Sequence, residues 1–210
     1  MNRMAMVLTL ILIPVVAFSE TPLKFGAGPQ VGLSFSSFPD VVKDYYGSGI
    51  GFGAHGDMEI MKYIAVRLNL DYHMFGFNSD KFAQQLAQAN NVNAGDIKVD
   101  GGSAKIFGIT LNGLGKIPTA SPVTPYGLFG FGIHANSISD LSVSYRGQPQ
   151  PQLTRKFEGE TKFGINFGAG AEFKVSKLVT LFFDIKYVII FTSDNSTKHV
   201  PLTLGASFRI

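Results

Sequence analysis

Histidine is the residue type in this sequence best suited to chemistry, because imidazole binds transition metals and activates serine nucleophiles. The chain has four histidines: His55, His73, His134 and His199. His134-Ala135-Asn136 comes close to the His-x-Ser pair of a lipid deacylase, but asparagine stands where the nucleophile is needed. Ser137, one position further on, does not restore the spacing. We therefore predict that the protein has no catalytic residues and is not an enzyme, and keep a lipid-modifying enzyme only as a remote alternative.

Metal, nucleotide and nucleic-acid sites also lack support in the sequence. The histidines are far apart along the chain, on stretches that we predict to be mostly non-adjacent strands. We therefore interpret them as polar residues near one end of those strands and not as metal ligands. Cysteine is absent, which removes disulfides and thiolate metal sites. The glycines recur at every second residue, unlike a phosphate-binding loop, and the basic residues are scattered. We predict no metal, no cofactor and no nucleic-acid partner.

A larger set of polar side chains recurs at every second position inside apolar stretches. This alternation predicts β-strands with one polar and one apolar face. Eight such stretches, each about 11 residues long, fit strands that cross a bilayer at a tilt; they are residues 24–36, 49–60, 64–74, 103–115, 124–136, 162–174, 179–190 and 200–210. The polar face carries His55, Asp57, Glu59, Arg67, Asn69, Asp71, Lys162, Asn166, Glu172, Lys174, Asp184, Lys186 and Arg209.

The connections between these stretches alternate between short and long. Residues 61–63, 116–123 and 175–178 are short turns, whereas the other links are longer and polar. This alternation is typical of membrane barrels with turns at one end and loops at the other. The fold class predicted is therefore all-β: an eight-stranded antiparallel up-and-down transmembrane β-barrel formed by residues 20–210.

The apolar face could in principle point inward, as in a soluble ligand-binding barrel. An eight-stranded barrel has an interior just wide enough for side chains to fill it. More than about thirty bulky apolar side chains would not fit there, and the outer face would be largely glycine. The reverse phase places the bulky side chains in lipid and the charges in a narrow lumen, so we favour the membrane barrel.

Strand register allows a finer prediction about the lumen. A three-residue turn at residues 61–63 pairs Ile60 with Ile64, and this pairing sets Asp57 opposite Arg67. The same register sets His55 opposite Asn69. Because unpaired buried charges are costly, we predict a hydrogen-bonded polar plug, with a hydrated pore lined by the same residues as the alternative.

Residues 1–19 have the pattern of an export signal. Arg3 is followed by an apolar run, and Ala17-Phe18-Ser19 offers small residues for cleavage before Glu20. The alternative is a membrane-spanning helix, but the run is short for a span of about 20 residues and contains Pro14.

The chain resembles the OmpA-like and opacity-protein-like family of outer-membrane barrels from residue 20 to residue 210. The segments that carry the resemblance are TPYGLFGFGI at 124–133, KFGINFGAGAEFKVSKLVTLFFDIKYV at 162–188 and VPLTLGASFRI at 200–210. The resemblance implies insertion in the bacterial outer membrane, in contact with its lipid. The last strand, with Phe208 and Ile210, resembles the signal read by the barrel-assembly machinery, although it ends in isoleucine instead of the usual aromatic residue. We expect a monomer without the cell-wall-binding domain of long OmpA-type proteins.

Function in such a barrel is expected in the outer loops, because a rigid scaffold presents them. In the loop at 75–102, Ser79 can cap a helix with Phe82, Leu86 and Ala89 on one face. This helix either covers the barrel mouth or binds a partner. The loop at 137–156 is expected to be extended, and either contacts a partner or is simply mobile; it carries Gln148-Pro149-Gln150-Pro151-Gln152 with Arg146, Arg155 and Lys156.

Two function classes follow from this pattern. The first is a structural or adhesin-like protein whose loops bind a host or envelope component. The second is a small porin-like channel for ions or small solutes.

Overall fold

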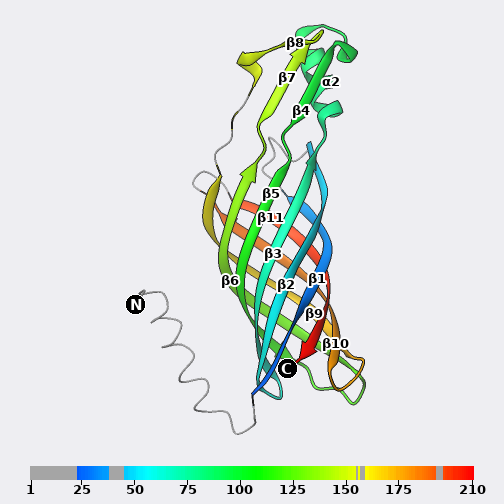
Figure 1. Cartoon of the computed structure of the whole chain (residues 1–210), viewed down its shortest axis with the longest axis vertical. Coiled ribbons are helices and arrows are strands. Elements are labelled where there is room, and N and C mark those ends of the chain that lie inside the picture. The colour runs from blue at the N-terminus through cyan, green and yellow to red at the C-terminus, as the bar shows by residue number, and fades with distance from the viewer. Residues whose placement is uncertain (1–22, 38–44, 155, 157–158, 193–195) are drawn as a thin grey trace, which may run out of the picture.

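A computed structural model describes residues 23–37, 45–154, 156, 159–192 and 196–210. The predicted export signal at 1–19 and the loop residue Arg155 lie outside these residues. Within the described chain, eight antiparallel strands close into a barrel (Figure 1). They are β1 (Lys24–Ser37), β2 (Tyr46–Met61), β3 (Ile64–Phe77), β5 (Ala104–Lys116), β6 (Val123–Ile138), β9 (Glu160–Lys174), β10 (Val179–Phe191) and β11 (Ser196–Arg209).

The strand order confirms the predicted up-and-down topology. Each strand pairs with the one before and after it in the barrel, and β1 closes the barrel by pairing with β11. The short turns all lie at one end, which we call the turn end, and the longer connections lie at the other, the loop end.

The predicted phase of the strands is also confirmed. Bulky apolar side chains such as Phe52 and Leu204 are exposed on the outer face, at 52% and 59%. Polar side chains on the opposite face are buried: Asn69 and Asp184 are each only 1% exposed. The barrel thus has an apolar exterior and a polar interior, which is the arrangement suited to lipid.

The predicted register between β2 and β3 is confirmed for the polar residues but wrong at the turn. Asp57 lies opposite Arg67, and His55 lies opposite Asn69. Met61, however, pairs with Ile64, because an irregularity between Glu59 and Met61 inserts one extra residue. In such a bulge the inserted residue breaks the alternation between the inner and outer faces of the strand. Ile60 is accordingly buried, at 7% exposure, and does not lie on the outer face.

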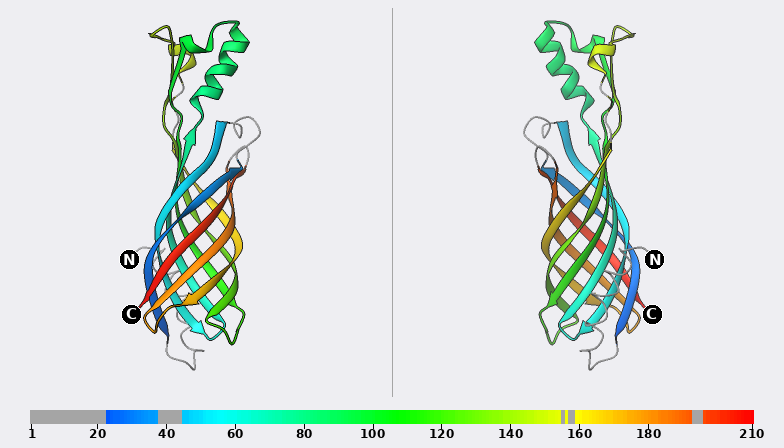
Figure 2. Two further views of the ribbon diagram at one scale, coloured as in Figure 1. Left: turned by 90° about the vertical axis from the view of Figure 1, so that its right-hand side faces the viewer. Right: turned by 90° about the vertical axis from the view of Figure 1, so that its left-hand side faces the viewer.

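Two outer loops form a folded unit beyond the loop end of the barrel (Figures 1 and 2). We call this unit, residues 78–102 and 139–153, the arm. Its sheet has the order β4 (Ile97–Gly101), β7 (Leu141–Tyr145) and β8 (Gln148–Pro149). Its helical elements are α2 (Ser79–Asn90) and the 3₁₀ helices η2 (Ala94–Asp96) and η3 (Pro151–Leu153). The prediction of a plain extended stretch at 148–152 was therefore only partly right.

Helix α2 packs on the arm sheet. Ala83 packs against Val99, Leu141 and Val143, and Ala87, one turn further along the helix, is also buried. The predicted face of Phe82, Leu86 and Ala89 was partly wrong, since Phe82 and Leu86 are half-buried at the edge of this core and Ala89 is exposed. The small side chains at these two buried positions allow the helix to approach the sheet closely.

The cap of α2 is Asn78 and not the predicted Ser79. The Asn78 Oδ1 accepts a hydrogen bond from the Lys81 backbone N–H at 3.0 Å. We expect Asn78→Ala to destabilise the arm by about 1 kcal/mol, because a helix N-terminal N–H loses its partner. Faster hydrogen exchange of the α2 amides would measure this. Ser79→Ala is the matched control, and equal effects of the two substitutions would contradict the assignment.

Candidate functional site

The guanidinium of Arg67 is the centre of the polar lumen. Arg67 is 1% exposed, and its nitrogens lie 2.6 Å from Asp57 Oδ1, 3.1 Å from Asp184 Oδ2 and 3.6 Å from Glu172 Oε1. These carboxylates come from β2, β10 and β9. The guanidinium also lies over the Phe182 ring, 3.9 Å from its centroid. One arginine thus connects four strands of the barrel through charge and ring contacts.

Hydroxyl groups complete this cluster. Arg67 Nη1 donates a hydrogen bond to Tyr126 Oη at 3.3 Å. The Tyr126 hydroxyl donates in turn to Asp184 Oδ2 at 3.2 Å. Ser207 Oγ donates to Asp57 Oδ2 at 2.9 Å. These two acids therefore each have a donor besides arginine, as buried carboxylates require.

We expect Tyr126→Phe to destabilise the barrel by about 1.5–3 kcal/mol, because the substitution removes a hydroxyl that forms hydrogen bonds with two charged groups. Urea unfolding of the lipid-folded protein would measure the loss. Tyr187→Phe, on the outer face of β10, is the control and should stay within about 0.5 kcal/mol of the unmodified protein. A similar loss for both variants would rule out a role for the Tyr126 hydroxyl.

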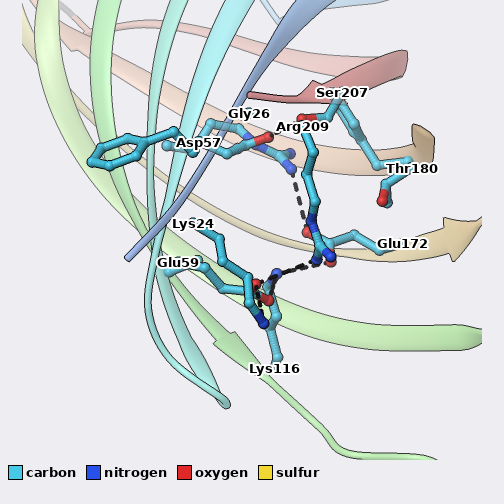
Figure 3. Close-up of a pocket in the computed structure, with 13 residues that line it drawn as sticks. Lys24, Gly26, Asp57, Glu59, Lys116, Glu172, Thr180, Ser207 and Arg209 are labelled. Atoms are coloured by element: carbon cyan, nitrogen blue, oxygen red, sulfur yellow. Dashed lines mark hydrogen bonds and ion pairs between the residues drawn. The ribbon is translucent and has the colours of Figure 1, made fainter. Parts of the chain in front are cut away.

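The lumen continues to the turn end as a second charged cluster. Lys116 Nζ lies 2.8 Å from Glu172 Oε2 and 3.3 Å from Glu59 Oε1, while Arg209 Nη2 lies 3.4 Å from Glu59 Oε2. Figure 3 shows Lys24, Glu59 and Lys116 gathered at this mouth, around a cavity of about 40 Å³. Charges of both signs alternate here, so the mouth has no strong preference for one sign of ion.

Towards the loop end, the lumen holds a buried ion pair and a group of histidines. Lys186 Nζ lies 3.6 Å from Asp71 Oδ2, and the Gln30 amide donates to the other oxygen of Asp71. Beyond this pair, three histidines meet although their strands are not neighbours in the sheet; they are His73, His134 and His199. The separation of their strands does not predict this contact, because side chains of a narrow barrel reach across its axis. Within the described part of the chain, no group of three potential ligands is arranged to hold a metal ion.

The structure brings together most, but not all, of the polar residues assigned to the lumen. Asn69 and Asn166 are buried there, each at 1% exposure. Lys174 is exposed at the turn end of β9, and Lys162 pairs with Glu160 at 3.1 Å near the loop end. The expectation that Lys174 joins the central network is therefore wrong, because its side chain is exposed at the end of the strand.

Several members of the network were missed from the sequence. The connection pattern predicts Lys116 in a turn, but Lys116 ends β5 and its side chain reaches Glu172. Tyr126 and Phe182 are inward by the same alternation that identified the charges, and only their apolar character concealed them. Strand parity, applied without regard to residue type, would have found both.

The residues proposed for interaction and assembly lie at opposite ends of the molecule. Arg146 is exposed on the arm, with its Nε 3.1 Å from Asp96 Oδ2, and Lys156 is exposed nearby in the chain. Phe208 and Ile210 are exposed on and just after the last strand, at 49% and 91%. Their roles in binding and assembly stay predictions.

Comparison with known proteins decides the family. A model of the outer membrane protein beta-barrel domain matches residues 5–209. The chain belongs to this family. No curated protein matches the sequence. Within the described residues, no helix is both long and apolar enough to span a membrane.

Solved structures with the same fold are found at low sequence identity. Neisserial surface protein A has a TM-score of 0.52 and 17% identity, covering 90% of this chain and 100% of its own. A major outer membrane protein from Thermus thermophilus has a TM-score of 0.51 and 14% identity, with the same coverage. This membrane barrel is thus a protein of the bacterial outer membrane. In such barrels the turns face the periplasm and the longer loops the outside.

Proposed function

We propose that this outer-membrane barrel is a surface-interaction protein whose arm contacts a component of the host surface or of the cell envelope. The observation that carries this proposal is the folded core of the arm. Two loops far apart in the sequence share a sheet and bury Ala83, Val99, Leu141 and Val143 between them. Ordering so many loop residues costs conformational entropy, and a loop that only connects two strands does not need to be ordered in this way. A rigid unit outside the membrane is suited to recognition.

The filled lumen supports an anchoring role for the barrel. The Arg67 cluster occupies the half nearer the turn end, and the half nearer the loop end holds an apolar cluster of Phe75, Ala104, Ile106, Val188 and Ile190. A role as a lipid deacylase has no support, because His134 is buried in the lumen whereas Ser137 is exposed on the other face of β6. We infer that the protein is not an enzyme.

The test is removal of the arm from an otherwise intact barrel. Residues 79–100 and 141–152 are each replaced by a short Gly/Ser linker, and heat-modifiable gel migration checks that the barrel folds. We expect binding of cells displaying the protein to epithelial monolayers, or to immobilised lipopolysaccharide, to fall at least about tenfold with unchanged solute permeability. Unchanged binding to both surfaces would overturn the proposal.

The second candidate function is a small conduit, and the charged residues along the lumen favour it. Planar-bilayer recording separates the two functions. Large steady currents that survive arm removal would support the conduit, while silence or rare small openings would support the anchor. We further propose that the monomeric barrel contacts outer-membrane lipid and that Phe208 and Ile210 are read by the assembly machinery.

A further inference from the structure

Three histidines from separate strands meet inside the half of the lumen nearer the loop end. His73 on β3, His134 on β6 and His199 on β11 are 7%, 4% and 1% exposed. They line one cavity of about 10 Å³, and the rings of His73 and His199 lie 5.1 Å apart. In the described part of the chain, one buried nitrogen of each has no hydrogen-bond partner: His73 Nδ1, His134 Nε2 and His199 Nδ1.

The surroundings of this cluster offer little compensation for positive charge. The carboxylate that lines the cavity among the described residues is Asp71, and it already pairs with Lys186. A second charged pair lies near the cluster on β9, where Lys162 Nζ is 3.1 Å from Glu160 Oε2. The other strands present neutral groups: Gln30 and Ser34 from β1, Gly51 from β2, Gly108 and Thr110 from β5, Gly164 and Asn166 from β9, and Thr203 from β11.

The histidine cluster lies directly beneath the apolar cluster that fills the lumen near the loop end. The ring of Phe75 lies 6.1 Å from that of His199, and Val188 lines the same cavity as the three histidines. Neutral imidazoles fit this environment, because their rings pack against apolar side chains. Charged imidazoles do not fit it, because an unpaired buried charge requires water.

We propose that these three histidines form an acid-sensitive latch that keeps the half of the lumen nearer the loop end dry at neutral pH and admits water on acidification. Histidine changes its charge between about pH 5 and pH 8. Protons taken up by neighbouring rings repel one another and repel Lys186. Each uptake therefore favours a hydrated lumen, in which water solvates the imidazolium, over the packed one. The packed lumen is therefore favoured above this pH range and is lost as the pH falls through it.

A single engineered thiol tests the latch, because the chain contains no cysteine of its own. Ala104→Cys places the thiol in the apolar cluster, at a site that is 3% exposed. The rate of its modification by a small charged methanethiosulfonate is measured in lipid vesicles from pH 7.5 to pH 5, relative to free cysteine at each pH. We expect this relative rate to rise at least about tenfold towards low pH, the change that one titrating group produces when its pKa differs by one unit between the two states.

Two histidine variants in the Ala104→Cys background make the test specific. The combined substitution His73→Gln, His134→Gln and His199→Gln should abolish the rise. His55→Gln is the matched control and should keep it, because His55 lies 3.4 Å from the Asp57 carboxylate in the other half of the lumen. Heat-modifiable migration confirms folding, and His199→Gln alone replaces the triple variant if that does not fold. An unchanged rate in the parent at low pH, or an undiminished rise in the cluster variant, would overturn the proposal.

Discussion

Replacing Arg67 with methionine is expected to destabilise the folded barrel by about 3–5 kcal/mol. The substitution keeps much of the length of the side chain but removes the charge that faces Asp57, Asp184 and Glu172. Three carboxylates would then share a narrow lumen without their common cation, and an uncompensated buried charge is far more costly than a lost surface ion pair. Urea unfolding in lipid vesicles, followed by gel migration, measures the difference.

The control for this experiment is Arg209→Met. Arg209 also contacts a carboxylate, with its Nη2 3.4 Å from Glu59 Oε2, but its side chain is 37% exposed. Water and Lys116 can compensate Glu59, so we expect a loss of about 1 kcal/mol or less. If both arginine variants lose the same stability, the buried Arg67 cluster stabilises the fold no more than an exposed ion pair does.

Val143→Asp is expected to unfold the arm while leaving the barrel intact. Val143 is 4% exposed and packs in the arm core with Ala83, Val99 and Leu141. A carboxylate there has no cation in the cluster, and burying it unpaired costs several kcal/mol. We expect limited proteolysis to cut residues 78–102 rapidly, and binding to fall as far as it does on arm removal.

Ser142→Asp provides the matched control, because Ser142 is exposed at the preceding position of the same strand. It adds the same charge without burying it. Asp100 lies opposite Ser142, so a small loss of about 1 kcal/mol or less is expected from the like charges, and proteolysis should stay far slower than in Val143→Asp. Heat-modifiable migration should be unchanged in both variants, since the arm core contains no residue of the barrel's lumen clusters. If Val143→Asp left the arm resistant to proteolysis, the arm would not be a folded unit.

Local pattern was sufficient to predict the barrel itself. Alternation with period two is a property of neighbouring residues in a strand, so the eight strands, their phase and the pairing of Asp57 with Arg67 could be inferred from the chain alone. The bulge at Ile60 could not be inferred from the sequence, because one extra residue in a strand ladder leaves no distinct mark in composition. Helix α2 was foreseen from its spacing, but its buried face was set by the sheet beneath it.

The sequence by itself thus determined which side chains face lipid and which face the lumen, because backbone geometry alternates them without regard to distant residues. The tertiary structure alone decided which lumen residues of non-neighbouring strands meet. Closure of the barrel brings Arg67 to Asp184 and Glu172, and it brings His73, His134 and His199 to one cavity. It also joins two loops into the arm, where β4 pairs with β7 beyond the ladder of β5 and β6. These contacts depend on the strand order and diameter of the closed barrel, which no local stretch of sequence encodes.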